Sequence, residues 1–202
     1  MLNEKTAVSG IILAGGKSAR MGTDKALLKV GPCCIIERIA GVFRTLVDEI
    51  LVVTDRPDKF AEYGDKTIGD IMPGHGPLGG LHAGLVRASH ARVLVAACDL
   101  PFISAPLACL LIQCAADYDA VVPRYRGYPE PLCALYSKNC IKIIEQRLTR
   151  NQNKITGLYD QVRVRYIEET EMLPVEPHPE RVLFNLNTPG DLKKARSWIA
   201  GC

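Results

Sequence analysis

A glycine-rich, basic segment near the start of the chain is the first place where residue types and spacing suggest chemistry. Between Leu13 and Lys25 lie the glycines 15, 16 and 22 and the cations Lys17, Arg20 and Lys25, against one acid, Asp24. Glycines let the backbone turn tightly and bring its N–H groups close to a ligand, and basic side chains add charge to those donors. The segment therefore predicts a polyphosphate site. The alternative is a solvated turn whose cations are incidental.

Two common nucleotide-binding patterns were compared with the glycine-rich segments of the chain, and neither accounts for them well. The P-loop pattern G-x-x-x-x-G-K-[ST] fails because Gly16 stands where lysine is required and Lys17 comes one residue late. A second glycine-rich segment, 74–79, matches the dinucleotide-binding pattern G-x-G-x-x-G, with Asp99 twenty residues beyond Gly79. That interpretation is weakened by Pro77, which removes a backbone donor, and by the residues that separate the segment from its strand.

Apolar runs alternate with amphipathic stretches over the first 117 residues. We expect strands at 9–14, 49–54, 67–70 and 92–98, and helices at 33–46, 78–88 and 106–116. Such alternation is typical of an α/β protein with a mostly parallel sheet and helices on both faces. Ligands bind such sheets at the carboxyl ends of the strands. The glycine-rich segment and Asp99, which follow two of these strands, should therefore share one edge.

The pattern changes beyond Asp117. Strands are expected at 120–123, 132–136 and 162–167, a loop or hairpin at 124–129, a helix at 137–149 and a surface connection at 173–179. Thr188 and Pro189 have the residue types of an N-cap and a first helical position, so a last helix should run to about residue 199.

Composition excludes several classes of protein. The chain has 202 residues, 48% of them hydrophobic and 23% charged, which is ordinary for a globular protein. A formal charge of +3 is too small to indicate a nucleic-acid or membrane-surface partner, and no apolar run approaches the roughly 18 residues of a membrane span. The eight cysteines form no C-x-x-C pair, and most of them stand among aliphatic residues. They are interpreted as buried thiols of a cytoplasmic protein.

Four segments, in the same order along the chain, resemble one enzyme family. Residues 13–25, Leu-Ala-Gly-Gly-x-Ser-x-Arg-Met-Gly-x-Asp-Lys, resemble the signature loop of the nucleotidyltransferases, and in particular of the molybdenum cofactor guanylyltransferases (molybdopterin-guanine dinucleotide synthases). Residues 76–81, 98–102 and 185–189 resemble that family's second motif, metal-binding segment and C-terminal motif. The resemblance implies a single domain over 1–202 with a Rossmann-like nucleotidyltransferase fold. Residues 1–117 would form a nucleotide-binding half and residues 118–202 an acceptor-binding half.

The reaction that the resemblance implies is transfer of GMP from Mg-GTP to the terminal phosphate of molybdenum-molybdopterin cofactor, with release of pyrophosphate. The partners would be these two small molecules and proteins that deliver the cofactor or receive the product. A phosphate monoester has a second pKa of about 6 and needs no general base. The sequence agrees, since no Ser/His/Asp or Cys/His arrangement is apparent. All four histidines, at positions 75, 82, 90 and 178, are interpreted as structural or surface residues.

The resemblance also carries residue roles. It implies Lys25, Arg20 and Asp99 as catalytic residues, with Asp99 as the Mg²⁺ ligand. It implies GTP contacts from Leu13, Ala14, Gly15, Gly16, Lys25, Asp70 and Asp99, and acceptor contacts from Asn185 and Asn187. Asp99 could instead cap a helix, Asp70 could form a turn, and the asparagines could belong to a turn and cap region. Arg124 and Arg126 could attract the acceptor or lie in a solvated loop.

Two other functions stay open from sequence. Related cytidylyltransferases typically carry Leu-Ala-Ala-Gly where this chain has Leu-Ala-Gly-Gly, and they lack the Gly-Pro-Leu-Gly-Gly segment, which favours guanine. A cytidylyl or sugar-phosphate transferase is the nearest enzymatic alternative. A non-catalytic GTP- or cofactor-binding protein is the other, and the joint presence of Arg20, Lys25 and Asp99 speaks against it.

Overall fold

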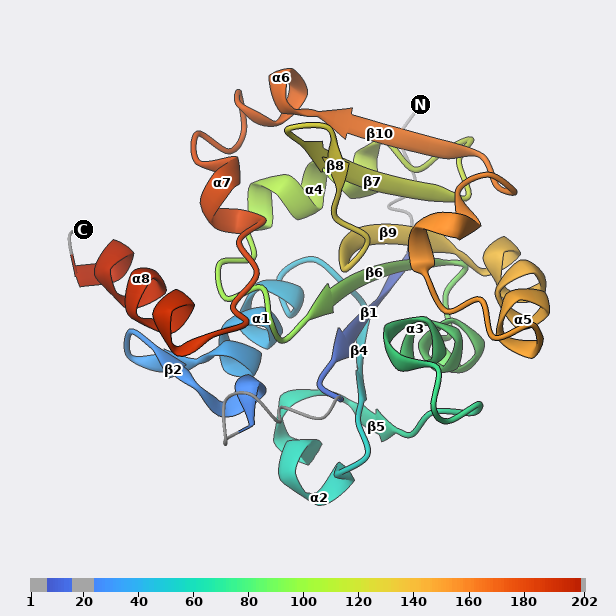
Figure 1. The fold of residues 1–202 in the computed structure, drawn as a ribbon, viewed down its shortest axis with the longest axis horizontal. Coiled ribbons are helices and arrows are strands. Elements are labelled where there is room, and N and C mark those ends of the chain that lie inside the picture. Colours follow the sequence, from blue (N-terminus) through green and yellow to red (C-terminus); the bar gives the residue numbers. More distant parts are fainter. Residues whose placement is uncertain (1–6, 16–23, 201–202) are drawn as a thin grey trace.

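The computed structural model describes residues 7–15 and 24–200. One continuous sheet runs through the molecule in the order β10-β7-β9-β6-β1-β4-β5, with β8 paired to β7 (Figure 1). Its strands are β1 (Val8–Leu13), β4 (Glu49–Val53), β5 (Lys66–Ile68), β6 (Arg92–Ala97), β7 (Ala120–Tyr125), β8 (Tyr128–Pro129), β9 (Cys133–Ser137) and β10 (Val164–Glu168). Strand β1 is parallel to β4 and β6, β4 to β5, and β7 to β10, whereas β9 is antiparallel to β6 and β7. The predicted mostly parallel sheet is confirmed.

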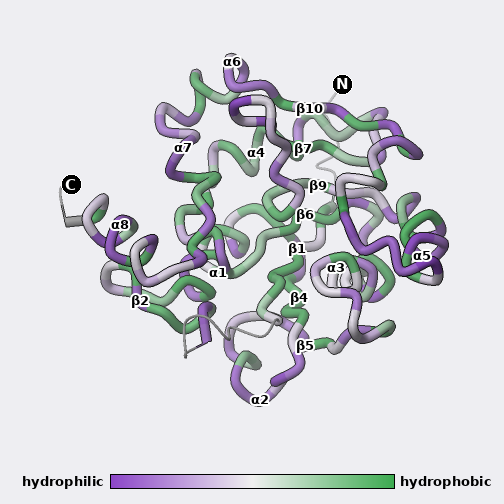
Figure 2. The backbone as a smooth tube through the Cα atoms, in the orientation of Figure 1, coloured by the Kyte–Doolittle hydropathy of each residue, from purple (hydrophilic) through white to green (hydrophobic). Residues whose placement is uncertain are grey.

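Helices cover both faces of this sheet, as predicted. They are α1 (Ile35–Phe43), α2 (Pro57–Phe60), α3 (Gly76–Arg87), α4 (Ala105–Gln113), α5 (Ile141–Thr149), α6 (Glu169–Met172), α7 (Pro179–Val182) and α8 (Pro189–Ala200). Alternate residues of β1 point to opposite faces. Ile12 packs in the core that contains α1 and α4, whereas Ile11 and Leu13 pack in the core that contains α3 and α5. The central strands are coloured as hydrophobic in Figure 2, as expected for strands that are buried on both faces.

Helix α3 lies directly on β1. A Cβ atom at Gly84 would come within 2.1 Å of Ile11 Cδ1, so only glycine permits this approach. One turn towards the start of the helix, a Cβ at Gly80 would lie 3.2 Å from Leu13 Cδ2. The N-terminus of α3 is therefore fixed beside the carboxyl ends of β1 and β4.

The predicted helix over 33–46 was wrong at both ends. Cys33–Cys34 forms a short strand, β3, antiparallel to β2 (Lys29–Val30), and α1 begins only at Ile35. The backbone N–H of Cys34 donates to Glu37 Oε2 at 3.2 Å, which closes the start of the helix. Proline at position 32 favours a helix start in general, but here it lies in the turn between the two paired strands. The helix ends at Phe43 and continues as turns.

Other predicted boundaries also moved. The strand predicted at 67–70 ends at Ile68, which leaves Asp70 in the loop after β5. Of the loop or hairpin predicted at 124–129, the structure shows the hairpin, in which β7 extends to Tyr125 and pairs with β8. Arg126 and Gly127 make the turn with φ of 50° and 79°. In the described part of the chain, no helix is long and apolar enough to cross a bilayer.

Candidate active site

The end of β1 is held between its two neighbouring strands. The N–H of Ala14 donates to Val53 O at 2.9 Å, and the N–H of Cys98 donates to Leu13 O at 3.1 Å. Ala14 is 4% exposed and Leu13 is 8% exposed, whereas Gly15 is already at the surface. The chain thus leaves the core at the carboxyl edge of the sheet, where the sequence predicted a nucleotide site. Two of the predicted residues, Gly16 and Arg20, lie outside the described residues.

Asp99 follows β6 at the same edge. Its carboxyl oxygen Oδ1 is buried and has no hydrogen-bond partner among the described residues. Burial raises the pKa of Asp99, while the charge of Lys25 and the residue's own N–H pull the pKa down. A buried carboxylate oxygen without a protein partner suits Mg²⁺, which prefers oxygen ligands and takes one or two carboxylates beside phosphate oxygens. The side chain therefore fits the predicted metal ligand better than a helix cap.

Lys25 opens a short 3-10 helix, η1 (Lys25–Leu27), whose N-cap is Asp24. Asp24 Oδ1 accepts from the N–H of Ala26 at 3.3 Å, and its Oδ2 lies 2.8 Å from Nη2 of Arg56, which follows β4. The Lys25 Nζ donates to Asn187 Oδ1 at 2.8 Å. The contacts of Asp24 thus hold the turn that carries Lys25. The Lys25 ammonium lies near Asn187 and close enough to Asp99 to affect its pKa.

Asp70 lies in the loop after β5 and faces the start of α3. A Cβ at Gly79 would lie 3.4 Å from Asp70 Oδ2, and one at Gly80 would lie 3.7 Å from Asp70 Oδ1. Burial and the charge of Asp55 raise the pKa of Asp70, and His75 lowers it. Asp70 therefore shares the carboxyl edge with Ala14 and Gly15, but on the side of β4 and β5.

The segment Asn185–Asn187 crosses the end of β6. The N–H of Leu186 donates to Asp99 O at 2.7 Å, which ties the segment to the metal-binding candidate. Asn185 Nδ2 donates to Glu130 Oε2 at 2.8 Å, while Asn187 faces Lys25. The structure thus brings Lys25, Asp99 and both asparagines together.

Glu130 is a site residue that sequence reasoning missed. It lies between β8 and β9, and burial together with the charge of Asp99 raises its pKa, while hydrogen bonds from Asn185 and the N–H of Leu132 lower it. Its contact with Asn185 joins residues 55 positions apart in the sequence. No local pattern around Glu130 could have indicated that contact.

Arg124, which could have attracted the acceptor, has partners within the protein, and His82 and the cysteines are placed as structural residues. Arg124 pairs with Glu168 and stacks over Tyr166, with 4.5 Å between its Cζ and the ring centroid. Buried His82 has its Nε2 3.2 Å from Glu145 Oε1. All described cysteines are free thiols, and four of them are buried: Cys34, Cys98, Cys133 and Cys140. In residues 7–15 and 24–200, no group of three or more His, Cys, Asp or Glu side chains could hold a metal.

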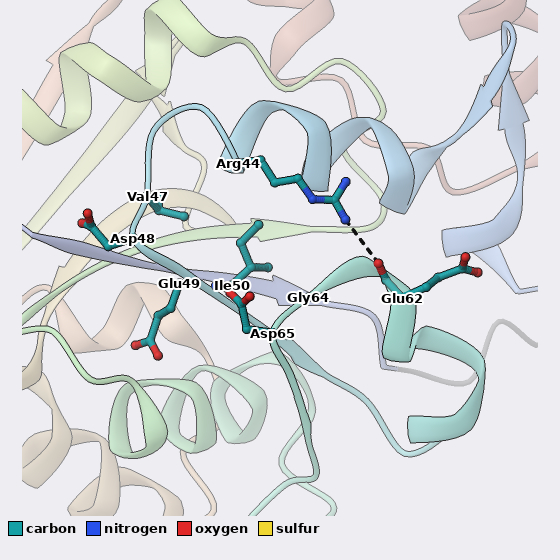
Figure 3. A pocket seen from close by; sticks show the side chains of 8 residues that line it. All are labelled: Arg44, Val47, Asp48, Glu49, Ile50, Glu62, Gly64 and Asp65. Atoms are coloured by element: carbon teal, nitrogen blue, oxygen red, sulfur yellow. Dashed lines mark hydrogen bonds between the residues drawn. The ribbon is translucent and has the colours of Figure 1, made fainter.

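A hollow of about 420 Å³ lies at the opposite end of the sheet (Figure 3). Its lining includes the acids Asp48, Glu49, Glu62 and Asp65. Two of these acids accept hydrogen bonds from the backbone: Asp65 Oδ2 from the N–H of Ile50 at 2.7 Å and Asp48 Oδ2 from that of Val8 at 2.9 Å. The hollow is at the amino ends of β1 and β4, whereas open parallel sheets bind ligands at the carboxyl ends. We therefore place the candidate active site at the carboxyl edge.

Comparison with known proteins shows which family the chain resembles. Residues 10–165 match the family model of the MobA-like NTP transferase domain. A protein of Pelotomaculum thermopropionicum named probable molybdenum cofactor guanylyltransferase is 43% identical, with 93% of this chain and 91% of the relative covered. The molybdenum cofactor guanylyltransferase of Desulfosudis oleivorans is 35% identical, with 96% of each chain covered.

Solved structures share the fold. The molybdopterin-guanine dinucleotide biosynthesis protein A of Archaeoglobus fulgidus superposes with a TM-score of 0.82 at 25% identity, over 96% of this chain and 100% of that one. The 2-C-methyl-D-erythritol 4-phosphate cytidylyltransferase of Thermus thermophilus has a TM-score of 0.71 at 18% identity, over 94% and 98%. The second likeness concerns the fold alone, which hosts more than one nucleotide specificity.

Proposed function

Because the chain belongs to the MobA-like NTP transferase family and is a nucleotidyltransferase, we propose that it transfers GMP from Mg-GTP to the terminal phosphate of molybdenum-molybdopterin cofactor. In this reaction an acceptor phosphate oxygen forms a bond to the α-phosphorus of GTP, and the bond to the bridging oxygen of pyrophosphate breaks. The names of the relatives support guanine and this acceptor. The observation that carries the proposal is the meeting of Lys25, Asp99 and Asn187 at the end of β6.

The chain's own residues would act mainly by placing charge. Leu13, Ala14 and Gly15 would contact the nucleotide through the backbone at the end of β1. Gly16 would contact GTP and Arg20 would act in catalysis, as the resemblance implies. Lys25 would neutralise the phosphates, and its anchored position makes that charge preorganised. Asp99 would hold Mg²⁺, which when bound screens the triphosphate and polarises it. Asp70 would contact the nucleotide on the β4–β5 side.

The acceptor would approach from the other side of β6. Asn185 and Asn187 lie there, in the half that contains β7 and β9, and would hydrogen-bond the acceptor. Its phosphate is already mostly dianionic at neutral pH, so no side chain has to remove a proton. The enzyme's task is then to hold two polyanions in line, which is how phosphoryl-transfer enzymes accelerate their reactions.

A pyrophosphate-release assay tests the proposal. Mg²⁺ is combined with each of GTP, CTP, ATP and UTP, with and without molybdenum-molybdopterin cofactor. We expect release only with GTP and acceptor together. Release with CTP, or with a sugar phosphate as acceptor, would replace the guanylyl assignment, and GTP binding without transfer to any acceptor would favour a binding protein.

A further inference from the structure

The side-chain amides of Asn185 and Asn187 have partners of opposite hydrogen-bonding character. A lysine ammonium can only donate, so Lys25 requires the carbonyl oxygen of the Asn187 amide, as observed. The N–H₂ group of Asn187 then points away from Lys25. Its orientation follows from the chemistry of its partner, which removes the usual ambiguity between amide oxygen and nitrogen.

Glu130 engages the nitrogen of the Asn185 amide, whereas Lys25 engages the oxygen of the Asn187 amide. Glu130 Oε1 accepts from the N–H of Leu132 at 3.2 Å, and Oε2 accepts from Asn185 Nδ2 at 2.8 Å. Both oxygens thus act as acceptors, which is the role of a carboxylate. The amide nitrogen of Asn185 is engaged and its Oδ1, which has no hydrogen-bond partner among the described residues, is turned the other way.

Backbone hydrogen bonds hold both ends of this arrangement. The N–H of Glu130 donates to Pro123 O at 2.9 Å, and the N–H of Leu186 donates to Asp99 O at 2.7 Å. Leu186 is fully buried between the two asparagines. The segment is therefore tied to the end of β6, with the two asparagines on either side of the residue that bonds Asp99.

We propose that Glu130 is a positioning residue that turns the Asn185 carbonyl towards the ligand, while Lys25 leaves the Asn187 N–H₂ available. The pair would recognise a ligand that offers N–H donors on a fused heterocycle together with acceptor oxygens. Guanine and a pterin both have this chemistry. We assign the pair to the pterin of the acceptor, because Glu130 lies beyond β6 from β1, β4 and β5. This assignment rests on the proposed function.

A double-mutant cycle tests the coupling. Glu130→Ala and Asn185→Ala should each lower kcat/KM for the acceptor about tenfold, since a hydrogen bond to a charged group is lost or its amide is misdirected. The double variant should lose no more than either single one, because Glu130 acts through Asn185. Glu130→Gln keeps one carbonyl that can accept from Asn185 but loses the bond from the N–H of Leu132, so it should restore part of the activity. Glu168→Gln, in the same half of the sheet, is the matched control.

The kinetic constants separate the two candidate ligands. We expect the KM for GTP to stay within about twofold of wild type in every variant of the cycle. A rise in the KM for GTP with no change for the acceptor would overturn the assignment to the pterin. Additive losses in the double variant would overturn the positioning role of Glu130.

A measurement without substrate keeps this inference separate from the proposed function. In protein labelled with ¹⁵N on asparagine, the side-chain N–H₂ of Asn185 should exchange with water at least about tenfold faster in Glu130→Ala than in wild type or Glu168→Gln. Equal exchange in all three proteins would refute the amide orientation, even if transfer is observed. Slow exchange in a wild type that transfers no GMP would support the orientation and reject the proposed function.

Discussion

The carboxylate of Asp99 lies at the end of β6, and one of its oxygens is buried with no hydrogen-bond partner in the described part of the chain. Burial raises its pKa, so the folded protein resists the ionised form that metal binding requires. Asparagine has nearly the same shape and carries no charge. Asp99→Asn should therefore stabilise the protein and abolish its activity.

The sign of the pH dependence follows from the raised pKa. Between the unfolded and the folded pKa of Asp99, the folded state binds more protons than the unfolded state. Stability then falls as the pH rises through this interval, and the penalty is complete above the folded pKa. Asp99→Asn removes this component, while the partly buried Glu130, whose pKa is also raised by burial, keeps part of the slope.

We expect Asp99→Asn to gain about 1 kcal/mol at neutral pH, a common size for relief of strain at a functional site. For a chain of this length the gain corresponds to a rise in Tm of about 2–4 °C. Transfer should fall by about 10² or more, the loss seen when one preorganised electrostatic contact is removed from an active site.

Calorimetry at two pH values, with and without Mg-GTP, measures the change in stability and the stabilisation by the ligand. The pyrophosphate-release assay measures the loss of transfer. Wild type should gain about 2.7 kcal/mol at ligand concentrations near a hundred times Kd, and Asp99→Asn should lose most of this gain. Asp58→Asn, on the exposed surface of α2, is the control and should leave Tm and ligand stabilisation unchanged. A variant at Asp99 that melts below wild type but still transfers GMP would refute both the burial argument and the metal role.

Four further substitutions test the site and the packing of the helices. Lys25→Ala should abolish pyrophosphate release while the midpoint of urea unfolding stays near wild type, because the side chain contacts only the partly exposed site edge. Arg56→Ala should lower kcat/KM for GTP about tenfold with an unchanged unfolding midpoint, since the turn that carries Lys25 loses its ionic anchor. Gly84→Ala should destabilise by about 1–3 kcal/mol in urea unfolding, because its Cβ would overlap Ile11. Gly41→Ala, whose new Cβ would meet no described atom within 4 Å apart from its chain neighbours and its own helix backbone, should instead stabilise by up to about 1 kcal/mol.

The sequence predicted the central strands well because burial on both faces leaves continuous apolar runs. Strands β1, β4 and β6 fall within one residue of the expected ends. Short elements were less predictable. Strands β2 and β3 have two residues each. Cys33–Cys34 is extended because it pairs with Lys29–Val30, which the composition of Cys33–Cys34 does not indicate.

The candidate site was predictable where it follows a buried strand. Ala14 and Asp99 come directly after β1 and β6, and topology brings strand ends of a parallel sheet to one edge. The contacts that orient the site were not predictable, because they join distant segments. Arg56 meets Asp24, and Glu130 meets Asn185, across loops whose mutual placement depends on the whole sheet.

The central claim is that the α-phosphoryl group of GTP moves to the acceptor. The most direct measurement incubates the protein, Mg²⁺ and molybdenum-molybdopterin cofactor with GTP labelled with ³²P at either the α- or the γ-phosphate. We predict that α-labelled GTP labels the pterin product. The label of γ-labelled GTP should appear in pyrophosphate and not in the product. Label from the γ-phosphate in the product, or an unlabelled acceptor in both reactions, would contradict the account.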